Sequence, residues 1–326
     1  MKKTLAFIST HIINPAVISE YNKLSKVKDI DCILLIDNMC VKYEFENRIQ
    51  EVEFLGTKVK CLFFDEKLNN EMNLPPFSWS KTEASFKDIM WYNADYRYMY
   101  ARKYFPDYDY YWQFDYDVYC NGTSYEPFFS KYSNRDEDLL ICDYREEKRE
   151  GQWFWSKDVG WIYPQDTIIA SFFPISRLSG NAIDYLYNRR IEQAKIYKDI
   201  PDKSHSRWLF CEIFVPTELK LANFKCDGIY EKYVSEKAWN VEFDLNDRLF
   251  ERPDNLLYHP IKGDFINRLK KLKDENRLLQ ERIKELNDMF EQEKNSQRIK
   301  MNILGIKISH RFRNKNSQTK EKQLTH

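Results

Sequence analysis

A run of mostly aromatic residues that ends in two aspartates constrains this chain more than any other segment. It reads Tyr-Tyr-Trp-Gln-Phe-Asp-Tyr-Asp over residues 110–117. The apolar part predicts a buried strand, and an ionised carboxylate there is costly unless it is paired, hydrogen-bonded or bound to a metal. Asp115 and Asp117, one residue apart, offer hard oxygen ligands to Mg²⁺ or Mn²⁺. The segment therefore predicts a core strand with a divalent-metal site at its end.

The length and composition are those of a chain with a large hydrophobic core. The chain has 326 residues, of which 43% are hydrophobic and 16% are aromatic, enough for one large α/β domain and an appendage. Basic and acidic residues number 51 each, so the net charge selects no class of partner. The seven cysteines are scattered and odd in number, which predicts reduced core residues in a cytosolic protein.

The amino-terminal residues are expected to form a core strand. The basic residues 2–3 and the uncharged stretch after them bear a superficial likeness to a secretory signal. Polar residues at 10–11 and 14, however, interrupt the apolar run. No segment approaches the roughly 18 continuous apolar residues of a membrane-spanning helix, so we do not expect the chain to cross a bilayer.

Short apolar runs in the first 120 residues predict buried parallel strands. They alternate with polar or helical segments, including one helix expected over residues 86–105, which indicates α/β wrapping around a mixed, mainly parallel sheet. Two more strands are expected at 138–143 and 168–175, and Ser179 is expected to cap a following helix. The four parallel runs are Leu5–Ser9, Cys32–Ile36, Lys60–Phe64 and Tyr110–Phe114.

Two later segments carry further candidate chemistry. Residues 255–262 end in His-Pro-Ile-Lys, and the imidazole of His259 can join carboxylate oxygens around a metal. A lone histidine is more commonly a surface or core residue. Residues 208–218 place Glu212 among hydrophobic neighbours, and burial would raise its pKa towards the range of a general base. The structural alternative is a core-edge glutamate satisfied by a backbone group or by an arginine such as Arg207.

Together these segments resemble the GT-A glycosyltransferases. The Asp-x-Asp of residues 115–117 resembles the family's metal-binding signature, His259 its late histidine ligand, and the segment around Glu212 its acceptor-side acidic segment. The resemblance covers residues 1–263 and rests on short motifs. The chain departs from many relatives in having only eight glycines. Phosphate cradles often use glycine for close backbone approach, so the resemblance does not identify the donor loop.

The resemblance implies a metal-dependent enzyme that moves a sugar from a nucleotide-sugar to a saccharide acceptor. Mn²⁺ or Mg²⁺ would be held by Asp117 and His259, with Asp115 assisting or binding ribose, and Lys262 would meet the phosphates. The coil and the tail described below lie outside the resemblance, and together with it they suggest a bacterial hexosyl- or related transferase that acts on a lipid-linked saccharide in surface-polysaccharide synthesis. Direct, inverting displacement is slightly favoured over retention.

The carboxyl ends of the predicted strands supply the other donor-site candidates, because ligands of open α/β sheets gather there. Thr10 follows the first strand and Asp37 follows the second, where it is a candidate for the nucleoside. Asn93 and Arg97, on the predicted helix, are candidates for contacts with the base or the phosphates. One shared site is therefore expected at this edge.

Acceptor binding is assigned to a segment rich in tryptophan. Trp153, Trp155 and Trp161 lie among polar residues, and such rings can form a platform for a saccharide. They can equally pack over a sheet edge, because aromatic side chains dominate cores as readily as pockets. Glu212 would remove the proton from the acceptor hydroxyl.

Two other readings are open. A nucleotidyltransferase also uses acidic metal ligands on an α/β sheet, but it usually needs a glycine-rich basic loop after the first strand, and none is evident here. A non-catalytic oligomeric scaffold with a degenerate sugar-binding domain would bind without turnover.

Residues 264–295 predict a coiled-coil helix, with apolar residues that alternate at spacings of four and three. The seam predicts a homo-oligomer through residues 265–290, in which a polar Asn276 would fix register at a cost in stability. Packing of this helix on its own domain is the alternative. The seam residues are Phe265, Leu269, Leu272, Asn276, Leu279, Ile283, Leu286 and Phe290.

The tail, residues 296–326, is basic and amphipathic. Between Glu293 and Glu321 there is no acidic residue, and basic side chains alternate with aliphatic ones over residues 298–315. Such a segment fits an anionic membrane surface; its many aliphatic residues argue against nucleic acid, and a solvated tail is the plain alternative. We therefore expect a cytoplasmic protein, peripheral at the inner face of the membrane.

Overall fold

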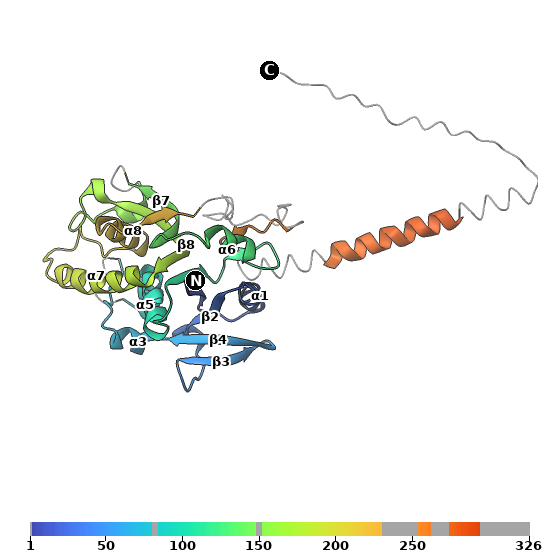
Figure 1. Cartoon of the computed structure of the whole chain (residues 1–326), viewed down its shortest axis with the longest axis horizontal. Coiled ribbons are helices and arrows are strands. Elements are labelled where there is room, and N and C mark those ends of the chain that lie inside the picture. Colours follow the sequence, from blue (N-terminus) through green and yellow to red (C-terminus); the bar gives the residue numbers. More distant parts are fainter. Residues whose placement is uncertain (1, 80–83, 148–151, 230–252, 262–273, 294–326) are drawn as a thin grey trace, which may run out of the picture. The chain divides into compact units, whose positions relative to one another are not determined.

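The strand that ends in Asp115 lies inside an eight-stranded sheet in the computed structural model of the chain (Figure 1). The sheet order is β3-β4-β2-β1-β5-β8-β7-β9, and four of its seven neighbouring pairs are parallel. This confirms a mixed, mainly parallel sheet. The strands are β1 (Thr4–Thr10), β2 (Ile30–Asp37), β3 (Ile49–Phe54), β4 (Thr57–Phe64), β5 (Tyr110–Asp115), β7 (Leu139–Glu146), β8 (Ile169–Ser179) and β9 (Cys226–Gly228), with β6 (Tyr119–Cys120) and β10 (Leu257–Tyr258) paired in a second, two-stranded sheet.

The structure describes residues 2–79, 84–147, 152–229, 253–261 and 274–293. Contacts divide the chain into two units, Met1–Asn267 and Arg268–His326. The helices of the first unit are α1 (Pro15–Leu24), α2 (Asn38–Val41), α3 (Glu66–Glu71), α4 (Phe86–Tyr92), α5 (Asp95–Tyr104), α6 (Glu126–Tyr132), η1 (Phe154–Ser156), η2 (Gln165–Thr167), α7 (Gly180–Lys198) and α8 (Cys211–Leu221).

Helices cover both faces of the sheet (Figure 1). Successive side chains of a strand point to opposite faces. In β1, Leu5 and Phe7 therefore join the core under α3, α4, α5, α7 and α8, and Ala6 and Ile8 join the core under α1 and α6. A sheet buried on both sides explains why the central strands are continuous apolar runs rather than alternating ones.

The predicted strands of the parallel core are confirmed as parts of β1, β2, β4 and β5. The runs expected at 138–143 and 168–175 lie largely within β7 and β8. Ser179 caps α7 as predicted, with its side chain accepting a hydrogen bond from the backbone N–H of Ala182 at 3.1 Å. Local patterning was therefore sufficient to find six of the eight strands of the sheet, and the two edge strands, β3 and β9, were not predicted.

The single helix expected over residues 86–105 was wrong, because the chain forms two helices that break at Asn93. Its backbone leaves the helical region with φ −117° and ψ 61°. The buried side-chain amide of Asn93 donates to the backbone oxygens of Phe77 and Ile89, and its oxygen accepts from the indole of Trp208 at 2.8 Å. Long-range bonds made by this side chain thus stabilise the break.

The seven cysteines, all within the described residues, are free. Four of them are buried, Cys32 and Cys226 are half-buried, and Cys40 is exposed. The expectation of free cysteines therefore holds for all seven. The expectation of core positions holds for the four buried ones and fails most clearly for Cys40.

In the second unit, the structure describes residues 274–293, which are helical. Several of their apolar side chains are exposed, among them Leu279, Ile283 and Leu286 of the predicted seam. The coiled coil over 264–295 remains a prediction, and the tail of residues 296–326 lies outside the described residues. Across the described part of the chain, no helix is both long enough and apolar enough to span a membrane.

A buried ion pair joins α5 to α7. Arg190, fully buried, makes two hydrogen bonds with the carboxylate of Asp95, both at 2.8 Å, and donates to the backbone oxygen of Leu209 at 2.8 Å. Its guanidinium also lies 3.7 Å from the ring centroid of Phe214. One side chain therefore ties α5 and α7 to the segment that leads into α8.

We expect Arg190→Met to lower the free energy of unfolding by about 3–5 kcal/mol, because it leaves the Asp95 carboxylate buried and unpaired. Urea unfolding followed by circular dichroism measures the change. In the double variant Asp95→Leu/Arg190→Met, most of the loss should be recovered. A single variant as stable as the wild type would show that the pair does not support the fold.

Candidate active site

A pocket of about 500 Å³ opens at the carboxyl ends of β1, β2, β4 and β5. Its lining includes residues that follow each of these strands or end them, and residues from α4, α5 and α8 on the other side. This is the edge at which ligands bind in open α/β sheets. The structure thus brings together the strand-end candidates Thr10, Asp37, Asp115 and Asp117 with His259 and Glu212.

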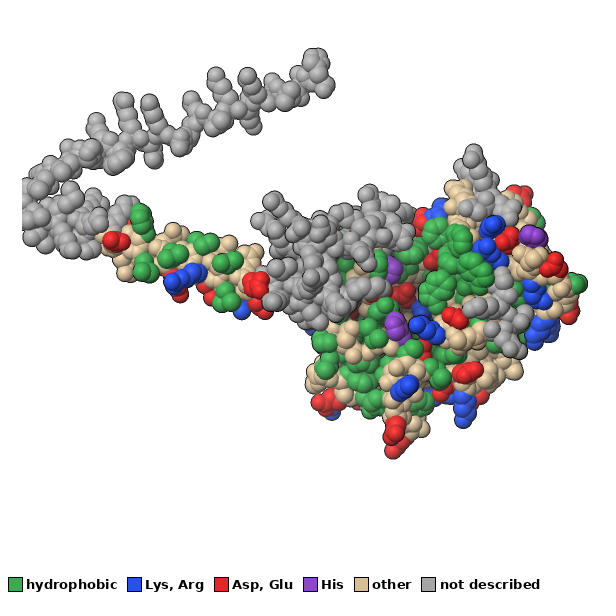
Figure 2. Space-filling view, turned by 180° about the vertical axis from the view of Figure 1, so that it is seen from behind, with side chains coloured by type: hydrophobic (Ala, Val, Ile, Leu, Met, Phe, Trp, Pro, Cys, Tyr) green, Lys and Arg blue, Asp and Glu red, His purple; other side chains and the backbone are tan. Residues whose placement is uncertain are grey.

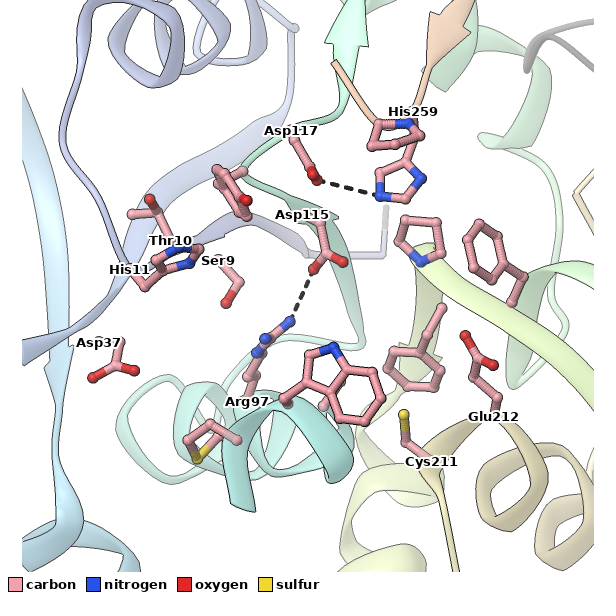
Figure 3. Close-up of a pocket in the computed structure, with 18 of the residues that line it drawn as sticks. Ser9, Thr10, His11, Asp37, Arg97, Asp115, Asp117, Cys211, Glu212 and His259 are labelled. Atoms are coloured by element: carbon pink, nitrogen blue, oxygen red, sulfur yellow. Dashed lines mark hydrogen bonds and ion pairs between the residues drawn. The ribbon is translucent and has the colours of Figure 1, made fainter. Parts of the chain in front are cut away.

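Asp115, Asp117 and His259 form a cluster that fits a divalent metal (Figure 3). One ligand atom from each lies within 4.8 Å of the others, and Nε2 of His259 is 3.2 Å from a carboxylate oxygen of Asp117. Two carboxylate oxygens and an imidazole nitrogen are a donor set for Mn²⁺ or Mg²⁺, which take further ligands from substrate and water. The donor set therefore fits the predicted metal.

The small second sheet positions His259. The antiparallel pairing of β10 with β6 matches Tyr258 to Tyr119, two residues beyond Asp117. The backbone N–H of Ile261 also donates to the backbone oxygen of Asp117 at 2.8 Å. These backbone bonds hold the segment around His259 beside the aspartates, although the two are far apart in sequence.

Arg97 contacts the same cluster. Its guanidinium donates to Asp115 at 2.8 Å, and the amide of Gln113 lies 3.3 Å from the same oxygen. Nε of Arg97 is buried and has no hydrogen-bond partner among the described residues. Burial raises the pKa of Asp115, while the charge of Arg97 opposes that rise and Asp117 adds to it. Arg97 thus supplies a positive charge within the pocket, next to the candidate metal ligands.

The predicted nucleoside side of the pocket is lined by Thr10 and Asp37. Thr10 is buried, and its hydroxyl bonds to the backbone of Ile12. Asp37 caps α2 by accepting from the N–H of Met39 at 3.0 Å, and burial raises its pKa. In Figure 3 both lie on one side of Asp115, and Glu212 lies on the other. The metal cluster is therefore flanked by two different ends of one pocket.

One donor-site candidate does not line the pocket, and another is not among the described residues. Asn93 is fully buried, and its amide is engaged with Phe77, Ile89 and Trp208. It supports the break between α4 and α5 instead of facing a ligand. Lys262 lies outside the described residues.

Glu212 lies in the first turn of α8 and is 5% exposed. One of its oxygens accepts from the indole N–H of Trp153 at 3.1 Å. Burial raises the pKa of Glu212 to about 8, although hydrogen bonds from the Phe173 backbone and from Trp153 favour the charged form. Arg207, which was considered as a partner, instead pairs with Asp158 at 3.1 Å. The carboxyl group therefore stands in the pocket wall, and none of the basic side chains that the structure describes is hydrogen-bonded to it.

The predicted acceptor tryptophans separate into two groups. Trp153 and Trp155 line the pocket. Trp161 does not: its indole donates to the backbone oxygen of Arg207 at 2.8 Å, and its ring packs against Tyr197. Trp161 therefore belongs to the packing of the fold, because its polar atom and its ring are both used there.

The sequence reasoning missed residues of α4 and residues at the start of α8. Lys87 and Trp91 line the pocket, as do Phe210 and Cys211. Lys87 and Trp91 are four residues apart, a spacing that places two side chains on one face of a helix. That spacing was a usable signal for Lys87 and Trp91.

Comparisons with known proteins assign no family to the chain. No protein-family model matches the sequence, and no curated protein matches it. Similar solved structures include mouse xyloside xylosyltransferase 1 in its apo form, 13% identical, with 79% of this chain and 97% of that one covered and a TM-score of 0.42. A second is a putative glucose-1-phosphate thymidylyltransferase from Bacillus anthracis in complex with a sucrose, 8% identical, with 70% of this chain and 87% of that one covered and a TM-score of 0.35. A third is a 4-diphosphocytidyl-2C-methyl-D-erythritol synthase from Anaerococcus prevotii, 12% identical, with 70% of this chain and 86% of that one covered and a TM-score of 0.34. At these values the likeness establishes neither the family nor the activity.

We expect the stability of Glu212→Gln relative to the wild type to increase as the pH rises from about 5 to about 8. In that window the unfolded chain has lost the Glu212 proton, which it releases near the ordinary value of 4.5, while the folded protein keeps it up to about pH 8. The unfolded state then binds fewer protons, so the wild type loses stability with rising pH.

Urea unfolding in chelator-containing buffers across this range measures the difference. Glu53→Gln, at an exposed position of β3, is the control and should show no such trend. Parallel curves for Glu212→Gln and the wild type would contradict the raised pKa.

Proposed function

We propose that this protein is a metal-dependent glycosyltransferase of GT-A type, which moves a sugar from a nucleotide-sugar to a saccharide acceptor. The observation that carries the proposal is the cluster of Asp115, Asp117 and His259, which lies in one pocket between the side lined by Thr10 and Asp37 and a buried carboxyl group, Glu212. A reaction that must hold a nucleotide diphosphate on one side and deprotonate a hydroxyl on the other requires this division.

The donor side is built from charges that suit a diphosphate. Asp117 and His259 would hold Mn²⁺ or Mg²⁺, with Asp115 assisting or binding ribose, and the bound ion would neutralise charge on the departing nucleotide diphosphate. Arg97 has a buried N–H without a partner among the described residues, and it would donate to a phosphate oxygen. Thr10 and Asp37 would contact the nucleoside, and Lys262 the phosphates.

On the acceptor side, Glu212 would act as the general base. Its carboxylate would take the proton of an acceptor hydroxyl, whose oxygen forms a bond to the anomeric carbon as the bond to the diphosphate breaks. A pKa of about 8 makes this carboxylate a stronger base than an exposed glutamate, and the Trp153 N–H holds one oxygen in place. Displacement of this kind inverts the anomeric centre.

The proposed membrane location, lipid-linked acceptor and self-association rest on the sequence beyond the first unit. The basic, aliphatic-rich residues 298–315 favour a protein that binds an anionic membrane at its cytoplasmic face. An enzyme held there would act on a lipid-linked saccharide in bacterial surface-polysaccharide synthesis. The exposed seam side chains Leu279, Ile283 and Leu286 favour self-association through residues 265–290.

Thermal unfolding with a panel of nucleotide diphosphates and nucleotide-sugars, each with and without Mn²⁺, tests the proposed function. A ligand that binds the folded state raises the melting temperature, and we expect a Mn²⁺-dependent rise with one nucleotide. Asp117→Asn should abolish that rise, while Asp166→Asn, an exposed acid outside the pocket, should leave it intact.

Turnover of the stabilising nucleotide-sugar completes this test. Glu212→Gln should keep the Mn²⁺-dependent rise and slow transfer by roughly 10²- to 10⁴-fold. Release of pyrophosphate from a nucleoside triphosphate without sugar transfer would identify a nucleotidyltransferase instead. Binding without any turnover would identify a scaffold, and no nucleotide binding at all would refute the proposed donor site.

Two truncations separate the roles of the coil and the tail. Deletion of residues 296–326 should remove salt-sensitive sedimentation with anionic liposomes and leave the oligomer intact. Deletion of residues 264–326 should also give a monomer in analytical ultracentrifugation. Unchanged liposome binding in the first variant would refute the membrane role, and an oligomer in the second would refute the coil.

A further inference from the structure

We infer that the acceptor is an oligosaccharide of at least two sugar rings, and that Trp91 supports the ring next to the one that reacts. The inference rests on the proposed function, because it concerns the acceptor end of the same pocket. The inference follows from the contacts between the aromatic side chains at that end and from the solvent exposure of each of them.

An aromatic cluster borders the acceptor end of the pocket, and we call it the rim cluster. Its rings meet at centroid distances typical of aromatic pairs. Trp155 stacks on Phe210 at 4.3 Å, and Trp91 contacts these two rings at 5.5 and 5.4 Å. Phe154 contacts Trp155 at 4.9 Å and Trp79 at 5.4 Å. The rim cluster is Trp79, Trp91, Phe154, Trp155 and Phe210.

Trp91 is the member of the rim cluster that both lines the pocket and is exposed to solvent. Its side chain is 57% exposed, and no other tryptophan, tyrosine or phenylalanine among the described lining residues is exposed. Phe210 is 5% exposed and stacked on Trp155. The Arg145 guanidinium lies 4.9 Å from the ring of Trp153. The open aromatic surface in this pocket is therefore that of Trp91.

The contacts of Trp91 connect it to the segment that carries Glu212. Trp91 contacts Phe210, which lies two residues before Glu212, and the Glu212 carboxyl is held by Trp153 of the same pocket wall. A sugar whose hydroxyl reaches Glu212 occupies the space beside Trp153 and Trp155. The next sugar of the acceptor then meets Trp91, where the pocket opens to solvent.

The chemistry around Trp91 fits a sugar better than an acyl chain. Trp91 presents an exposed indole to the pocket, and the apolar C–H face of a pyranose packs against the electron-rich face of an indole. Cations border the patch: Arg207 lies 4.4 Å from the ring centroid of Trp79, and Lys87 lines the pocket one helical turn before Trp91. Such groups bind hydroxyls, which an acyl chain lacks. Figure 2 shows hydrophobic side chains gathered in a patch with charged side chains along its margin.

A glycan panel of monosaccharides and their di- and trisaccharide extensions tests the inference on the full chain, with Mn²⁺ and the stabilising nucleotide diphosphate present. We expect the wild type to retain glycans of two or more rings more strongly than the matching monosaccharide. Trp91→Ala should lower retention of the longer glycans by roughly tenfold, the scale of one stacked ring, and leave monosaccharide retention unchanged. Trp91→Phe should restore part of the difference.

Phe154→Ala is the matched control. Phe154 is 53% exposed and belongs to the rim cluster, but it does not line the pocket. Its loss should leave glycan retention unchanged. Equal losses in Trp91→Ala and Phe154→Ala, equal retention of all lengths by the wild type, or no retention of any glycan would overturn the inference. Binding of neutral liposomes that depends on Trp91 would assign the surface to lipid and also overturn it.

The Mn²⁺-dependent melting shift is measured on the same variants and separates the two failures. If the shift is present and the length dependence is absent, the oligosaccharide inference fails alone. If the shift is absent in the wild type, the proposed function fails.

Discussion

The buried guanidinium of Arg190 is the interaction on which the geometry of the pocket depends. It binds Asp95, two residues before Arg97 in α5, and the backbone of Leu209, three residues before Glu212. The guanidinium of Arg190, which is planar and rigid, thus fixes both the helix that carries Arg97 and the segment that leads to Glu212. Three hydrogen bonds and an aromatic face offset the cost of burying the charge. Any shift of α7 would move both sides of the site.

The metal cluster depends on a second, weaker constraint. Asp115 ends the central strand β5, which is paired on both sides, and Asp117 follows in the turn two residues later. His259 is placed by a two-residue strand, β10, that pairs only with β6. Asp115 therefore stands on a strand that is hydrogen-bonded to neighbours on both sides, while His259 follows a short strand late in the chain. Metal binding would link the two and favour the folded arrangement of both.

The two ends of the pocket differ in polarity, and this difference gives each end its chemistry. Near β1, β2 and β5 the pocket lining carries both acidic and basic side chains, namely Asp37, Arg97 and Asp115. Near α8 the lining is aromatic, and desolvation there keeps a proton on Glu212 to about pH 8. Under the proposed function, a charged donor and an apolar sugar face would meet these different surroundings within one cavity.

The sequence by itself determined the strands of the core, the cap of α7 and the acids at the end of β5, because strand runs, caps and hard oxygen ligands are local patterns. It also pointed to His259 and Glu212 by residue type. Only the tertiary structure decided that Asn93 breaks a helix, that Trp161 packs in the fold and that Trp91 lines the pocket. The reason is physical: a side chain's type limits what it can bind, but the face it presents depends on neighbours contributed by distant parts of the chain.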